Sequence, residues 1–94
     1  MKPELFQTLF RNKTLKIERI TSRGHATPKG KWLRGRRNEW VMLLSGAAKL
    51  RLQRGRLLSM KAGSSVLIPA GKAHRVDWTR PEADTVWLAI HFSA

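Results

Sequence analysis

The sequence predicts an all-β domain, a sandwich or barrel of short strands. Several segments of four to nine residues are either apolar almost throughout or alternate between apolar and polar residues, as strands buried on two faces or on one face do. Dipeptides that favour turns separate these segments, among them Ser45-Gly46, Arg54-Gly55 and Arg80-Pro81. Short strands at regular intervals with such turns are typical of β-sandwiches and β-barrels.

The N-terminal half contains one exception to this pattern, followed by three expected strands. Glu4–Phe10 fits a turn or two of helix, so we expect a short helical or irregular segment there. Thr14–Ser22 alternates and predicts a strand, although its pattern is weaker than the others. Glu39–Leu44 is apolar after its glutamate, as a central strand is. Ala48–Gln53 alternates leucine with polar residues, as a strand with one wet face does.

Three further strands are expected in the C-terminal half. Ser65–Ile68 is short and mostly apolar, and Pro69 ends it because proline cannot donate to a strand ladder. In the next strand, Ala73–Trp78, alternation places His74, Val76 and Trp78 on one face. The last strand, Thr85–Phe92, places His91 on the same face as Trp87.

Length and composition favour one domain, residues 1–94, with its core between about residues 15 and 92. The chain has no cysteine, which excludes a disulfide framework and a thiolate metal site. No apolar run approaches the roughly 20 residues of a membrane-spanning helix. We therefore expect a cytoplasmic protein with no membrane partner.

The charge is strongly positive. There are 19 lysines and arginines against 6 acidic residues, giving a formal net charge of +13. Such a chain attracts polyanions, including nucleic acid. The basic residues are spread from Lys2 to Arg80, with one local concentration in Lys29–Arg37, and one expected hairpin carries Lys49, Arg51, Arg54 and Arg56. Non-specific binding of nucleic acid or another polyanion is therefore one functional hypothesis; a cationic surface that keeps the protein in solution is the alternative.

One segment carries a recognisable motif. From Gly63 to His74 the chain reads as glycine, five residues, Pro69-Ala70-Gly71, two residues and histidine. This pattern resembles the second motif of the cupin family. Upstream, Glu39 followed six residues later by Gly46 resembles the second half of the first cupin motif, and the interval from Gly46 to Gly63 suits a short hairpin. The resemblance covers roughly residues 15–92 and implies a cupin fold, a double-stranded β-helix or jelly-roll barrel.

The resemblance also implies a site, and the sequence departs from the family pattern there. In metal-binding cupins two histidines precede the glutamate and join it, with the histidine of the second motif, around a divalent ion. Only Glu39 and His74 match this ligand set. Counted with four intervening residues, the histidine positions fall on Trp32 and Arg34, which are not ligands. Two protein ligands hold a metal weakly, so we expect no cofactor or a weakly bound divalent ion. His25 and His91 are the other histidines that could contribute a ligand, but neither occupies a ligand position of the family.

Arg34 offers a different use of the same pocket. A guanidinium opposite Glu39 would pair with its carboxylate and repel a divalent cation. The pocket would then suit an anionic small molecule. The alternative is that Arg34 lies in a basic loop and points to solvent.

Tryptophans are the remaining candidates for the pocket wall. Trp32, Trp78 and Trp87, together with His91, are predicted to line it, although large aromatic residues equally fill small β-cores. Trp40 is expected to pack against another sheet or another chain.

These observations leave three functions open. The first is a cupin that binds a small, anionic ligand through Trp32, Arg34, Glu39, His74, Trp78, Trp87 and His91, metal-free or with a weakly held metal. The second is a metal-dependent cupin enzyme of the isomerase or dioxygenase type, in which Glu39 and His74 would be the catalytic candidates. The third is the polyanion binder. A homodimer is expected in each case, because a short barrel leaves apolar faces and strand edges open.

Overall fold

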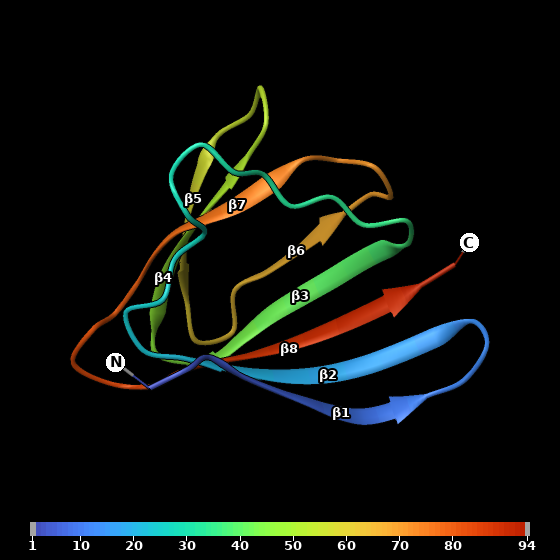
Figure 1. The fold of residues 1–94 in the computed structure, drawn as a ribbon, viewed down its shortest axis with the longest axis horizontal. Helices are drawn as coiled ribbons and strands as arrows, with labels where there is room; N and C mark the ends of the chain where they lie inside the picture. Colours follow the sequence, from blue (N-terminus) through green and yellow to red (C-terminus); the bar gives the residue numbers. More distant parts are fainter. Residues whose placement is uncertain (1, 94) are drawn as a thin grey trace.

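Two antiparallel β-sheets face each other in the computed structural model, which describes residues 2–93 (Figure 1). Met1 and Ala94, the ends of the predicted domain, lie outside the described residues. One sheet has five strands in the order β1-β2-β8-β3-β6, and the other has three in the order β5-β4-β7. The strands are β1 Leu5–Arg11, β2 Leu15–Ser22, β3 Asn38–Ser45, β4 Ala47–Leu52, β5 Leu57–Lys61, β6 Ser65–Ile68, β7 His74–Thr79 and β8 Thr85–Phe92.

The all-β prediction is confirmed, and each of the six predicted strands is present. Ser65–Ile68 and Thr85–Phe92 have the predicted bounds, and the other four differ by one residue at one or both ends. The predicted hairpin between Gly46 and Gly63 is formed by β4 and β5. Within residues 2–93 there is no helix of the length and hydrophobicity needed to cross a membrane.

The expected helical or irregular segment at Glu4–Phe10 is wrong, because Leu5–Arg11 is strand β1. It pairs antiparallel with β2, from Leu5 opposite Thr21 to Arg11 opposite Lys16, with a bulge between Thr8 and Phe10. The neighbouring strand supplies the backbone partners that a short isolated helix lacks, so tertiary pairing outweighs the local pattern.

The core lies between the sheets and draws on both of them. Leu43 and Ala89 are completely buried, and Leu50 is 2% exposed. The remaining buried core residues are Val41, Ala48, Met60, Ile68 and Trp87. Gly46 makes the tight β3–β4 turn with φ of +90°, and a Cβ there would collide with Thr85. Only glycine fits this position without strain.

A bulge in β7 changes the predicted alternation of that strand. Lys49 pairs with Trp78 but Leu50 pairs with Val76, which leaves Asp77 as the extra residue. Thr79 therefore faces the core at 1% exposure, and Trp78 turns outward at 38%. The prediction that Trp78 shares a face with His74 and Val76 is wrong for this reason.

Candidate functional site

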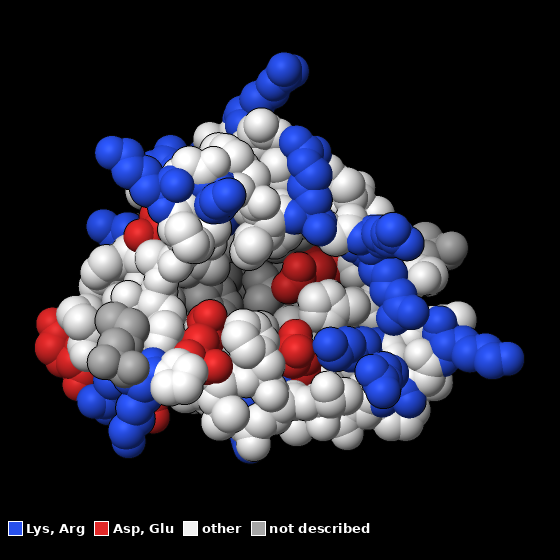
Figure 2. Space-filling model, viewed as in Figure 1, with Lys and Arg blue, Asp and Glu red and all other residues white. Residues whose placement is uncertain are grey.

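A cavity of about 320 Å³ opens between the two sheets. Figure 2 shows a hollow in this face of the molecule, with acidic side chains around it and most basic side chains towards the periphery. The volume is at the lower end of the range for small-molecule sites. Its wall is mostly apolar and consists of Glu4, Phe6, Ile20, His25, Ala26, Thr27, Pro28, Leu33, Glu39, Val41, Leu50, Ile68, His74, Val76 and Trp87.

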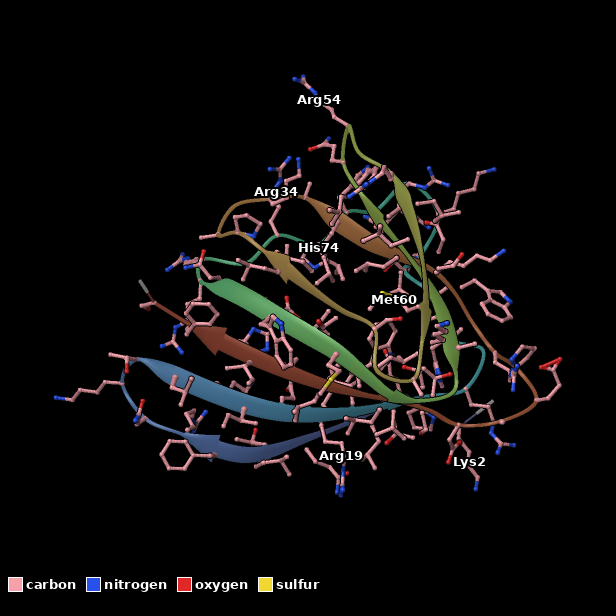
Figure 3. All side chains as sticks on the ribbon, turned by 180° about the vertical axis from the view of Figure 1, so that it is seen from behind. Lys2, Arg19, Arg34, Arg54, Met60 and His74 are labelled. Carbon is pink, nitrogen blue, oxygen red and sulfur yellow. The ribbon has the colours of Figure 1, made fainter. Side chains whose placement is uncertain are left out.

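Glu39 and His74 meet at this cavity from opposite sheets. Glu39 is near the start of β3, and His74 begins β7 directly after the turn around Pro69-Ala70-Gly71. Glu39 Oε1 lies 3.7 Å from His74 Nε2, and the two side chains are 19% and 8% exposed. In Figure 3, His74 lies in the interior between the sheets. The structure thus brings together the two residues that match the cupin motifs.

The hydrogen bonds of His74 define what its ring offers to the cavity. Nδ1 lies 3.0 Å from the carbonyl oxygen of Lys72, and because a carbonyl only accepts, Nδ1 carries the hydrogen and donates. In the neutral ring, Nε2 is then an acceptor. It faces the carboxylate of Glu39, which is also an acceptor, at a distance too long for a hydrogen bond. The pair can therefore receive a hydrogen-bond donor from a bound molecule.

The backbone around His74 is fixed by a short bridge to the loop before β3. His74 N donates to the Leu33 carbonyl at 3.0 Å, and Leu33 N donates to the His74 carbonyl at 2.7 Å. Leu33 lines the cavity although it is 45% exposed, and its exposed neighbours Trp32 and Arg34 are not part of the cavity wall. Extended chain alternates its side chains, which explains why one of the three points inward and two point outward.

Arg34 does not lie opposite Glu39. Its Nη1 donates to the carbonyl of Gly71 at 2.9 Å, and its Nη2 donates to Gln53 Oε1 at 3.3 Å. Figure 3 shows the side chain on the outside of the molecule. The structure therefore contradicts the inference of a guanidinium in the pocket, and Arg34 instead holds the turn before His74.

The same alternation decides which spacing of the first cupin motif applies. With three residues before Glu39, instead of four, the two histidine positions fall on Leu33 and Gly35, and Leu33 is the residue in the cavity wall. Neither residue has a side-chain ligand. Within residues 2–93 no group of three or more histidine, aspartate or glutamate side chains is arranged to hold a metal ion. With either spacing, Glu39 and His74 are the positions of the family's ligand pattern that carry donor side chains.

The two other histidines are engaged elsewhere. His25 lines the cavity instead of lying in solvent as expected, but its Nδ1 accepts from Arg23 N at 2.8 Å and its Nε2 lies 2.7 Å from the Lys2 carbonyl. His91 lies opposite Glu39 in the β3–β8 register, and its Nε2 is 3.3 Å from Glu18 Oε1. His91 is outside the cavity wall, contrary to expectation.

Of the three candidate tryptophans, only Trp87 lines the cavity, at 4% exposure. Trp78 lies on the outer side of β7 with Lys49 Nζ 5.7 Å from its ring centroid, a cation–π contact. Trp32 is 39% exposed and is not part of the cavity wall.

Glu4 and Phe6 also line the cavity and were not among the predicted site residues. Phe6 belongs to β1 and Glu4 directly precedes it, in the segment that was expected to be helical or irregular. Glu4 accepts a hydrogen bond from Ser22, which is 1% exposed. An alternating interpretation of the first ten residues would have placed Glu4 and Phe6 on one face.

Comparisons with known proteins agree on one family. The model of the Cupin domain matches residues 24–91. A Ralstonia eutropha JMP134 protein, described as a "putative mannose-6-phosphate isomerase", is 42% identical with a TM-score of 0.96, covering 100% of this chain and 88% of that chain. No curated protein matches the sequence.

Two more distant structures share the fold. A cupin superfamily protein from Desulfitobacterium hafniense DCB-2 is 14% identical with a TM-score of 0.81, covering 98% of this chain and 79% of that chain. A cupin domain from Bordetella pertussis Tohama I is 22% identical with a TM-score of 0.72, covering 100% and 99%. At these identities the likeness concerns the fold alone.

Proposed function

Because this chain belongs to the Cupin domain family, we propose that it binds a small molecule in the cavity between its sheets, through hydrogen bonds to Glu39 and His74. The predicted family and its all-β barrel fold are confirmed by the comparisons. The observation that carries the proposal is that Glu39 Oε1 and His74 Nε2 lie 3.7 Å apart in a largely apolar cavity; with the imidazole neutral, both atoms are acceptors. Within residues 2–93 no fully buried side-chain nitrogen or oxygen lacks a hydrogen-bond partner, so these two atoms are open to the cavity, where a donor of the ligand can reach them.

The charge of the cavity wall defines the part of the ligand that enters it. The wall contains two carboxylates, those of Glu4 and Glu39, and among the described residues it contains no lysine or arginine. This part of the ligand is therefore uncharged or cationic, with an apolar body and at least one hydroxyl or amine hydrogen. Because Arg34 lies outside the cavity, the anionic group that the ligand was expected to carry has no arginine to pair with there. The name of the Ralstonia protein refers to a sugar phosphate, whose hydroxyl groups are donors of this kind.

The test is a thermal-shift screen with sugars, polyols, amines and carboxylates on the wild type and on two cavity variants. Glu39→Gln keeps the side-chain shape but replaces an acceptor by a donor, and His74→Phe removes the Nε2 acceptor. A compound at about 100 times its Kd stabilises the protein by about 2.7 kcal/mol, which raises Tm by more than about 10 °C in a domain of this size. We expect both variants to lose this shift.

Glu82→Gln is the matched control, because Glu82 is exposed and outside the cavity wall. It should retain the whole shift. Compounds that stabilise Glu39→Gln and His74→Phe as well as the wild type would contradict the proposed site. Manganese, nickel and zinc belong in the same screen: a stoichiometric metal whose stabilisation requires Glu39 and His74 would favour the metal-dependent enzyme instead.

A further inference from the structure

A second pocket, of about 310 Å³, lies at the end of the barrel where β2 begins and β8 ends. We call it the rim pocket. It is lined by Lys16, Glu18, Gly35, Arg36, Arg37 and His91. Lys16 and His91 are register partners of β2 and β8, and the three residues from Gly35 belong to the basic loop before β3.

The rim pocket is positive, whereas the cavity is negative. Lys16, Arg36 and Arg37 supply three positive charges against the one carboxylate of Glu18, which leaves +2 with His91 neutral. Both carboxylate oxygens of Glu18 already have partners. Lys16 Nζ lies 3.4 Å from Oε2, His91 Nε2 lies 3.3 Å from Oε1, and the side chain is 11% exposed. The two arginines are thus not neutralised by it.

Arg37 is held in place while part of its guanidinium stays available. Its Nη2 donates to the carbonyl of Lys13 at 3.2 Å. A guanidinium has five N–H groups, so one such bond orients the fork and leaves other donors for a ligand. Arg36 beside it is exposed. Two arginines beside one hollow are suited to an oxyanion.

The two pockets adjoin each other. His91 of the rim pocket and Glu39 of the cavity are directly opposite in the β3–β8 register. Side chains of such partners lie on the same face of the sheet, with Cβ atoms about 5 Å apart. One small molecule can therefore reach from the cavity across Glu39 and His91 into the rim pocket.

We propose that the rim pocket binds the oxyanion group, a phosphate or a carboxylate, of the ligand whose uncharged part occupies the cavity. The inference rests on the proposed function and narrows it to one class: a small molecule with an apolar or hydroxylated body, at least one donor hydrogen and one anionic end. The carboxylates of the cavity repel that end, and Arg36 and Arg37 attract it, so the charges also determine the direction in which the ligand lies.

The test is a titration with inorganic phosphate at neutral pH, followed by NMR on the wild type and on two double variants. A protein of net charge +13 attracts phosphate over its whole surface, so the variants must remove equal charge. Arg36→Gln with Arg37→Gln removes two charges from the rim pocket. Arg54→Gln with Arg56→Gln removes two from the β4–β5 hairpin, whose tip at Arg54 points away from the molecule (Figure 3).

In the wild type we expect saturable shifts of the Gly35 amide and the His91 ring. The rim-pocket variant should lose at least tenfold in affinity, and the hairpin variant less than twofold. An equal loss in both double variants, or shifts spread over the surface without saturation, would overturn the inference.

The outcome is independent of the cavity screen. If phosphate binds at the rim pocket but the binding of no compound depends on Glu39, the proposed function is wrong and the rim pocket remains an anion site. If compounds bind in a way that depends on Glu39 but phosphate binding is unaffected by Arg36→Gln and Arg37→Gln, the inference about the rim pocket is wrong and the proposed function stands.

Discussion

Asp77, the extra residue of the β7 bulge, joins two strands through two arginines. Its Oδ2 accepts from Arg51 Nε at 2.8 Å, and its Oδ1 accepts from Arg75 Nε at 2.7 Å. Arg75 also donates to the carbonyls of Thr27, Pro28 and Lys31. Since Thr27 and Pro28 line the cavity, this network connects the bulge that turns Trp78 outward with the loop that closes the site.

This network predicts a specific dependence of stability on pH. The hydrogen bond from Arg51 is the main reason that the pKa of Asp77 lies below its ordinary value of 3.8; Arg75 adds to the effect, and partial burial opposes it. The unfolded chain therefore binds the proton more readily. The stabilisation is fully present above about pH 3.8 and is lost as the pH falls through the folded value.

We expect Asp77→Asn to have a lower Tm than the wild type at pH 6, with the difference shrinking below pH 4. Thermal unfolding monitored by circular dichroism from pH 3 to pH 7 measures it. Asp84→Asn is the control, because the Arg23–Asp84 pair is more than half exposed on both sides and such pairs contribute about 0–1 kcal/mol. A difference for Asp77→Asn that stays constant with pH would contradict the assignment.

The residues predicted for the site divide according to how far the chain stays regular. Glu39 and His74 were placed correctly because the glycine and proline turns of the motifs fix where their strands begin. Trp78 was misplaced by a bulge, which no alternating pattern reveals. Arg34 was misplaced because a motif spacing that is one residue longer moves the counted position to the opposite side of an extended chain. Leu33, which does enter the cavity, lies between the two positions that were considered.

At the scale of the elements, β1 was the segment least accessible to prediction. Its sequence, LFQTLFR, is compatible with both helix and strand, and its strand conformation depends on pairing with β2 across the turn at Asn12, whose Oδ1 accepts from Thr14 N and Leu15 N. The inner strands needed no such help, since their apolar runs indicate burial directly. Edge strands depend on context in a way that central strands do not.

The position of β1 at the edge of the sheet predicts its dynamics. It pairs only with β2, whereas β8 is paired on both sides, with β2 and β3. We expect the β1 amides to exchange hydrogen for deuterium at least tenfold faster than those of β8, because an edge strand opens without unfolding the core. Exchange measured by NMR at neutral pH tests this. Amides of β6, the opposite edge strand, are the internal comparison and should also exchange early. Protection of β1 equal to that of β8 would mean that another chain covers this edge.

At the scale of the whole molecule, the outer face of the five-stranded sheet is strongly apolar. One cross-strand row follows from the registers of the sheet: Phe10 pairs with Ile17, Ile17 with Ile90, Ile90 with Trp40, and Trp40 with Leu67. Every strand of the sheet contributes to it, and its ends, Phe10 and Leu67, are 50% and 53% exposed. The neighbouring row contains one charge, Arg19, which donates to Gln7.

We expect this face to pack against the same face of a second copy, so that the protein is a homodimer. An apolar face of this extent marks an interaction site, and a face with a single arginine allows two chains of charge +13 to approach with little repulsion between them. A two-fold axis through the apolar row pairs it with itself. Ile90, at the centre of the row, and Trp40 beside it are then the residues that the dimer buries most completely.

Leu67→Arg tests this arrangement, because it places two like charges at the contact and removes apolar area from both copies. Sedimentation equilibrium should show a dimer for the wild type and at least a hundredfold weaker association for the variant. Leu57→Arg on β5 is the matched control: it adds the same charge at a leucine that is 41% exposed on the other sheet, and it should remain dimeric. Equal weakening by both substitutions would show that charge alone opposes association. A monomeric wild type would contradict the prediction that a second copy of this chain covers the apolar face.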